Sequence, residues 1–246
     1  MMKKILLSVL FGLGLTLGAF AQTNVQFHYD FGRTLYSSDQ ASRPHITTTL
    51  EHLSSDKWGS TFFFVDVCSN STGVQSAYTE ITRDFKLGDS PITAHVEYNG
   101  GLWSDNDAGV GYQYDNSYLL GVKYTLHSAD FSRGISFIPM YKYIQKNSSP
   151  NNFQFTTVWW LNFCNGGYTF SGFADIWRED SRGDGYGSLC KFITEPQFWF
   201  NLNKLIDGFE MPISVGSEIE ISQGFVNMTF EDKFYINPTL AVKWTF

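Results

Sequence analysis

The alternation of apolar and polar residues, repeated along almost the whole chain, is the feature that most constrains its fold. In the segment Val25–Phe31 every second residue is apolar or aromatic, and the residues between them are Gln26, His28 and Asp30. Successive side chains of a β-strand point to opposite faces, so this period of two predicts strands with one apolar and one polar face. The same alternation recurs in residues 92–98, 153–163, 213–222 and 234–246. Helical periodicity is almost absent, and the sequence predicts a single all-β domain.

Twelve candidate strands follow from this pattern, in blocks of about nine to twelve residues. They begin near residues 24, 44, 58, 76, 92, 116, 135, 153, 168, 189, 212 and 234. Such blocks are longer than the strands of about five or six residues in soluble sandwiches, and they match tilted strands that cross about 25–30 Å of hydrocarbon. Because strands in lipid must satisfy their backbone hydrogen bonds among themselves, we expect a closed, twelve-stranded antiparallel transmembrane β-barrel of the bacterial outer membrane.

The connections between the blocks alternate in length, and this predicts the orientation of the barrel. Short or moderate turns are expected at residues 54–57, 87–91, 127–134, 165–167 and 203–211. Longer polar loops are expected at residues 33–43, 69–75, 100–114, 146–151, 178–188 and 223–233. Outer-membrane barrels have short turns in the periplasm and longer loops outside. We therefore expect both termini on the periplasmic side.

The N-terminal residues have the features of a secretory signal. Met1–Lys4 is positively charged, residues 5–20 are predominantly apolar, and Ala19 and Ala21 form an A-x-A cleavage motif. The alternative is a membrane anchor, but the apolar run is short for a spanning helix. We predict a cleaved signal peptide at residues 1–21 and a barrel at residues 22–246. The net charge of −7 becomes −9 once Lys3 and Lys4 are removed, which argues against a nucleic acid polymer as partner.

Aromatic residues make up 17% of the chain, and many lie near the ends of the blocks. That placement is typical of the aromatic girdles of membrane barrels and predicts outer-membrane lipid as a partner. The segment Phe234–Phe246 resembles the C-terminal signature of Gram-negative outer-membrane proteins. This resemblance implies that Trp244 and Phe246 act as an assembly signal, read by the barrel-insertion machinery.

The polar face of a lipid-embedded barrel lines its lumen, so its residues carry the functional prediction. Acidic side chains are expected to face inward at Asp30, Glu51, Asp66, Glu80, Asp84, Glu97, Asp175, Glu195, Glu218 and Glu220. Inward bases are fewer, and Trp160, Phe173, Trp177 and Trp199 add aromatic faces. A lumen of this width and chemistry favours a channel for a small polar solute. The alternative is a closed barrel in which these charges pair, with a structural or surface-interaction role.

The sequence predicts neither an enzyme nor a cofactor or metal site. None of the five histidines lies in a recognisable nucleophile motif such as G-x-S-x-G. The three cysteines, Cys68, Cys164 and Cys190, have no C-x-x-C or Cys/His spacing typical of metal ligands.

Two motifs resemble the nucleoside-specific, channel-forming (Tsx-like) outer-membrane porins. The first is STFFFVDVCSN followed by AYTEITRDFKLG, in which an aromatic strand ending in an acid leads to a Tyr-x-Glu strand. The second is GFADIWREDSRG, with an acidic and aromatic pair. The resemblance implies a twelve-stranded barrel that passes nucleosides, with lumen contacts at Phe62, Phe64, Asp66, Tyr78, Glu80, Asp175 and Trp177. The chain departs from the family in its shorter loops and in lacking a match for the remaining binding positions.

Overall fold

The structure is a computed structural model that describes residues 20–105, 108–180, 188–225 and 233–246. The predicted signal peptide, residues 1–21, lies outside the described residues except for Phe20 and Ala21, which begin the first strand. Among the described residues, no helix is long and apolar enough to cross a membrane.

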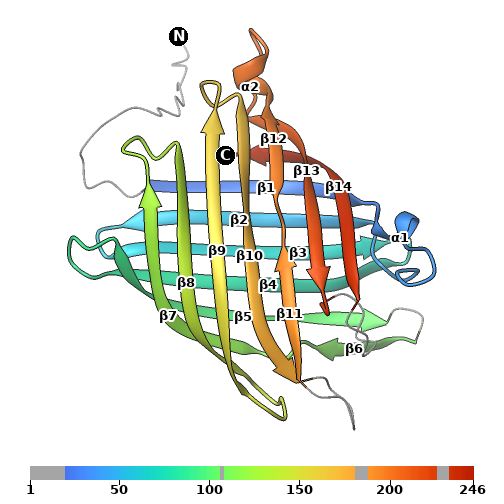
Figure 1. Ribbon diagram of the computed structural model, residues 1–246. Coiled ribbons are helices and arrows are strands. Elements are labelled where there is room, and N and C mark those ends of the chain that lie inside the picture. The colour runs from blue at the N-terminus through green and yellow to red at the C-terminus, as the bar shows by residue number, and fades with distance from the viewer. Residues whose placement is uncertain (1–19, 106–107, 181–187, 226–232) are drawn as a thin grey trace, which may run out of the picture.

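Antiparallel strands make up most of the described chain (Figure 1). The strands are β1 (Phe20–Asp30), β2 (Ile46–Asp56), β3 (Gly59–Asn70), β4 (Gly73–Lys86), β5 (Ile92–Asp105), β6 (Val110–Gln113), β7 (Ser117–His127), β8 (Arg133–Ile144), β9 (Asn151–Phe163), β10 (Tyr168–Asp180), β11 (Ser188–Thr194), β12 (Gln197–Asn201), β13 (Ile213–Gln223) and β14 (Phe234–Thr245). Two single-turn helices, α1 (Gly32–Leu35) and α2 (Leu202–Leu205), lie in connections.

The described strands form one closed ring of twelve barrel strands, as predicted. β11 and β12 are two halves of one barrel strand, because both pair with β10 and β13 in a continuous register, from Ala174↔Thr194 to Ser171↔Gln197. Pro196, which has no backbone N–H to donate, lies at the break. β6 pairs only with β5 and extends that hairpin beyond the ring.

The ring closes where β1 pairs with β14. The register runs from Asn24↔Thr245 to Asp30↔Thr239, and Thr23 and Phe246 exchange two backbone hydrogen bonds of 2.8 and 3.3 Å at its end. In Figure 1 the strands of the near wall cross those of the far wall steeply, which is the tilt that barrel closure requires. With β1 and β14 paired to each other, neither is left as a sheet edge.

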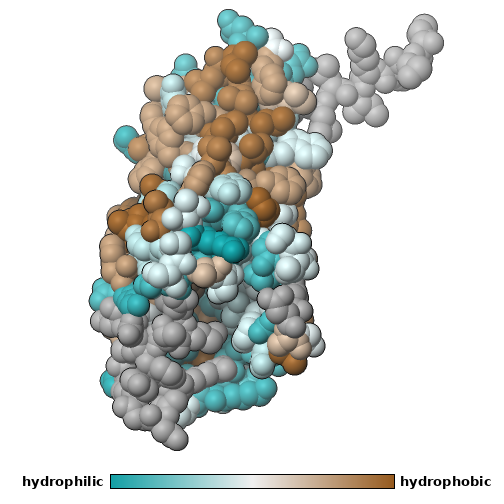
Figure 2. Space-filling model, turned by 90° about the vertical axis from the view of Figure 1, so that its right-hand side faces the viewer, coloured by the Kyte–Doolittle hydropathy of each residue, from teal (hydrophilic) through white to brown (hydrophobic). Residues whose placement is uncertain are grey.

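The two faces of each barrel strand differ as the alternation predicts. On β1, Phe27 is 55% exposed on the outside, whereas His28 is 2% exposed and points into the lumen. β14 repeats the pattern, with exposed Leu240 and Val242 outside and buried Ala241 inside. Figure 2 shows the face that carries β13 and β14, with apolar side chains gathered in its upper part and polar ones below. The apolar outer surface is what a strand facing lipid needs.

Two of the predicted long loops are wrong. Residues 69–75 were expected to form a loop, but β3 continues to Asn70 and β4 begins at Gly73. The Asn70 side chain accepts hydrogen bonds from the backbone and hydroxyl of Thr72, which closes a tight hairpin from residues that also suit loops. Residues 100–114 likewise contain the end of β5 and the whole of β6. Both segments are rich in Gly, Ser, Asn and Asp, which also suit loops, and their alternation is too short to reveal a strand.

Candidate functional site: the barrel lumen

The cross-strand register turns every acid that was predicted to face inward toward the lumen. Glu179 of β10 lies on the same face as Asp175, so it faces the lumen as well. Among the described residues the lumen therefore holds eleven carboxylates: Asp30, Glu51, Asp66, Glu80, Asp84, Glu97, Asp175, Glu179, Glu195, Glu218 and Glu220. Five Lys or Arg side chains face them there: Arg43, Lys123, Lys142, Lys191 and Lys243. The lumen of the described part is thus strongly acidic.

The first Tsx-like motif forms one patch on the wall made by β3 and β4. Phe62 and Phe64 have ring centroids 6.2 Å apart, and the Phe64 and Tyr78 rings are 6.1 Å apart across the two strands. The Tyr78 hydroxyl donates a 2.7 Å hydrogen bond to Glu80. Asp66 accepts one of 2.5 Å from the hydroxyl of Thr49. Aromatic rings therefore lie beside carboxylates that can each accept further hydrogen bonds.

Lys142 of β8 occupies the centre of a second group. Its ammonium lies 4.3 Å from the centroid of the Trp177 ring and donates a 2.7 Å hydrogen bond to Gln154. The Trp177 indole N–H in turn donates to Glu179 at 3.0 Å. The carboxylates within electrostatic range of Lys142 are Glu80, Glu97, Asp175 and Glu179. Residues from both Tsx-like motifs thus meet around one lysine.

Lys243 of β14 has a similar setting. Its ammonium lies 4.0 Å from the centroid of the Trp199 ring, which is fully buried. Glu51 and Glu218 are the carboxylates within electrostatic range of Lys243. Asp66 belongs to the same side of the lumen, because it interacts electrostatically with Glu218.

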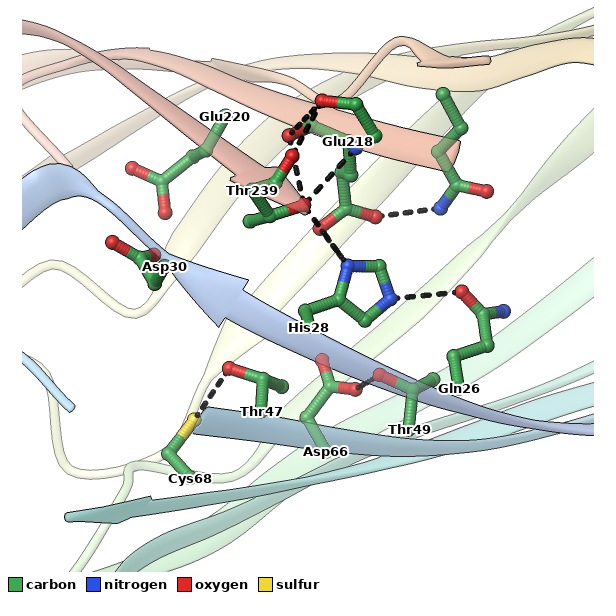
Figure 3. A network of polar contacts seen from close by, with 12 residues as sticks. Gln26, His28, Asp30, Thr47, Thr49, Asp66, Cys68, Glu218, Glu220 and Thr239 are labelled. Carbon is green, nitrogen blue, oxygen red and sulfur yellow. Dashed lines mark hydrogen bonds and ion pairs between the residues drawn. The ribbon is translucent and has the colours of Figure 1, made fainter. Parts of the chain in front are cut away.

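A network of neutral and charged groups connects β1 to β13 and β14 (Figure 3). The two ring nitrogens of His28 contact Gln26 at 2.9 Å and the Thr239 hydroxyl at 3.2 Å. Glu218 approaches the same ring to 3.9 Å and accepts a 2.6 Å hydrogen bond from Gln197. His28 and Gln26 are almost fully buried, so this network fills part of the lumen.

An ion-pair cluster on β4, β5 and β7 shares Glu97 with the group around Lys142. Asp84 contacts His95 at 2.7 Å and Lys123 at 2.9 Å, and the other His95 nitrogen contacts Glu97 at 3.2 Å. His95 and Asp84 are buried. Lys123, unlike Lys142, is therefore paired directly with a carboxylate.

The connection between β1 and β2, residues 31–45, folds into one mouth of the barrel. The Arg43 guanidinium binds Asp30 and Glu220, both at 2.8 Å, and Gln40 donates a 3.1 Å hydrogen bond to Asn237. Burial opposes the charged form of Arg43, but the carboxylates of Glu220 and Asp30 outweigh it and raise the pKa of Arg43 above its ordinary value. This arginine ties β1 and β13 together through the loop.

A second contact holds the same loop to β14. Lys233 and Tyr235 donate hydrogen bonds of 3.1 Å to Asp39. The hydrogen bond from Lys233, followed by those from Ser38 and Tyr235, lowers the pKa of Asp39. Residues 31–45 thus contact several strands of the barrel.

The predicted site residues of the β3–β4 patch border two lysines. Glu80, Asp175 and Trp177 lie around Lys142, whereas Asp66 lies on the side of Lys243 and Glu218. Trp244 and Phe246 are exposed on the outer face of β14, at the end that pairs with the start of β1. Sequence reasoning missed Arg43 and Gln40, because a connecting loop has no periodicity that reveals which side chains turn inward.

Comparison with solved structures identifies the fold. The NanC porin is 14% identical, with a TM-score of 0.51 over 90% of this chain and 98% of that one. LpxR from Salmonella typhimurium is 10% identical, with a TM-score of 0.47 over 92% of this chain and 99% of that one. OccAB3 from Acinetobacter baumannii is 11% identical, with a TM-score of 0.42 over 82% of this chain, which spans only 55% of OccAB3. The likeness to NanC supports the closed antiparallel barrel seen here.

Sequence comparison identifies the family. No curated protein matches the chain. Residues 21–246 match the family described as a domain of unknown function, DUF5020, and because this match covers nearly the whole chain, the protein belongs to that family.

Proposed function

We propose that the protein is a channel of the bacterial outer membrane through which small polar solutes pass passively. The observation that carries this proposal is a closed barrel with an apolar outer face and a lumen lined by charged side chains that keep some solvent access. Glu51, Glu80 and Glu195 face the lumen and remain partly exposed. Their exposed surface lies inside the ring, so unfilled space remains beside these carboxylates.

Single-channel recording in planar bilayers tests this proposal. Correctly folded protein, identified by a gel mobility that changes on heating, is expected to give discrete openings. Folded protein that inserts into the bilayer but gives no openings at any voltage would contradict a channel function.

The proposed topology has a cleaved signal peptide at residues 1–21 and both ends of the barrel domain in the periplasm. The connections at the terminal end of the ring include the tight turns at residues 57–58 and 164–167. The opposite end carries the loop at residues 31–45 and the β5–β6 extension. Short periplasmic turns and longer external segments are typical of outer-membrane barrels.

We propose nucleosides as one class of solute. The proposal rests on the resemblance of the β3–β4 motif to the Tsx-like porins, and the geometry of that wall supports it. Phe64 and Tyr78 could stack on a base, and Asp66 and Glu80 could accept hydrogen bonds from ribose hydroxyls. Aromatic stacking on a base contributes about 1–3 kcal/mol.

Replacing Phe64 with leucine is expected to weaken the block of channel current by nucleosides about tenfold, because one stacking surface is lost. The measurement is the nucleoside concentration that halves the current. Phe63→Leu is the matched control, since Phe63 is the neighbouring residue of β3 and faces outward. Equal block of both variants and the unchanged protein would remove the support for nucleosides and leave a general pore.

The second candidate function is a closed barrel with a structural or surface-interaction role. The observation in its favour is the filling of the lumen by residues 31–45 and by the fully buried His28 and Trp199. Bilayer recording separates the two functions, because a closed barrel inserts without conducting.

A further inference from the structure

The lumen contains two copies of one local arrangement, a lysine ammonium lying on the face of a tryptophan. Lys142 lies 4.3 Å from the Trp177 ring centroid and Lys243 lies 4.0 Å from that of Trp199. Neither lysine forms an ion pair within 4.0 Å among the described residues, although carboxylates surround both. An aromatic face with carboxylates at a short distance is the chemistry that binds alkylammonium ions.

Four carboxylates of the lumen accept hydrogen bonds from neutral donors. Asn24 donates to Glu51, Thr49 to Asp66, Tyr78 to Glu80 and Gln197 to Glu218. Neutral donors orient a carboxylate without cancelling its charge. The carboxylate oxygens are therefore oriented toward the lumen, where they favour cations over phosphate and carboxylate groups.

Asp175 has a buried oxygen atom that Lys142 leaves without a donor. Its Oδ1 atom is fully buried and has no hydrogen-bond partner in the described part of the chain. The residue points into the group around Lys142, on the same face of β10 as Trp177. A buried carboxylate oxygen without a donor is costly, and a bound ammonium group would satisfy it.

We propose that Trp177 and Trp199 mark two binding sites for the ammonium group of a small organic cation, and that Lys142 and Lys243 occupy these sites as tethered substitutes. The lumen is then a pathway for cations and neutral solutes that excludes anions such as nucleotides. The pathway rests on the channel function proposed above, whereas the two binding sites do not require conduction.

The affinity of the unchanged protein for a free amine is set by competition between that amine and the Lys142 ammonium. A group on a short flexible stem has an effective concentration of about millimolar at a site within its reach. A free amine must therefore reach millimolar concentration to displace Lys142. Removing the lysine ammonium should reveal the site.

Calorimetric titration of the detergent-folded protein with butylammonium chloride tests the site at Trp177. Lys142→Met is expected to bind butylammonium at least about tenfold more tightly than the unchanged protein, because the competing ammonium is gone. Lys123→Met is the matched control, since it removes the same charge from a lumen lysine that is paired with Asp84 at 2.9 Å. Equal affinity in the two variants overturns the proposal.

A double variant locates the site. Adding Trp177→Leu to Lys142→Met should abolish the gain in affinity, since the aromatic face is lost. Retention of the gain would show that the cation binds elsewhere and would overturn the assignment to Trp177. A mobility change on heating confirms that each variant still forms a barrel.

The reversal potential across a potassium chloride gradient tests the pathway. The unchanged channel is expected to prefer potassium over chloride, and a preference for chloride overturns the cation pathway. Absence of openings would refute the channel function together with the pathway, while the calorimetric result would still decide the binding sites.

Discussion

Arg43→Met is expected to raise the single-channel conductance several-fold. Arg43 is bound to Asp30 and Glu220 at 2.8 Å and holds residues 31–45 in one mouth of the barrel. Removing one partner of a buried ion pair costs about 3–5 kcal/mol, because the remaining charges lose their compensation. The two carboxylates then repel each other, the part of the loop around Arg43 loosens, and the passage at this mouth widens. Conductance in planar bilayers measures the change directly.

Arg33→Met is the control for this prediction. Arg33 lies in the same loop and carries the same charge, but its guanidinium contacts the His45 ring at 3.1 Å rather than a lumen carboxylate. Its replacement should leave the conductance close to that of the unchanged protein. Equal conductance in both variants would mean that residues 31–45 do not limit the current.

Phe246→Ala is expected to lower the amount of barrel inserted in the outer membrane several-fold. Phe246 extends the seam between β14 and β1 through its backbone bonds to Thr23, and its exposed ring lies 5.5 Å from that of Trp244. We propose that the insertion machinery reads this aromatic pair. Alanine keeps the backbone pairing and removes only the ring, so the defect should appear in cells as a loss of heat-modifiable protein from the membrane fraction.

Two comparisons separate recognition from stability. Phe234→Ala removes another exposed ring from the opposite end of β14, and this variant should insert normally. Purified Phe246→Ala should also fold into lipid vesicles, where no insertion machinery is present. If it fails to fold there, the ring stabilises the barrel itself and is not an assembly signal.

Much of the barrel could be predicted because each strand that faces lipid on one side and the lumen on the other needs alternating apolar and polar residues. The predicted strand starts lie within about four residues of the observed ones, as for β5 at Ile92 and β10 at Tyr168. The prediction was wrong at Ser69–Gln75, where β3 and β4 run on through residues that also suit loops. β6 was missed for the same reason.

The faces of the lumen residues were also predictable, but their partners were not. The period of two is enough to turn Lys142 and Trp177 inward, because each side chain alternates with an apolar neighbour that faces lipid. Their meeting depends on β8 and β10 lying on either side of β9, and on the register of both pairings.

The sequence by itself therefore determined the class of fold, the number of barrel strands and the acidic character of the lumen. Only the tertiary structure decided that Lys142 lies near both Glu80 of β4 and Trp177 of β10, and that Arg43 ties its loop to β1 and β13. The physical reason is that alternation acts between neighbouring residues, whereas contacts across the lumen depend on ring order, strand tilt and the path of a loop without periodicity.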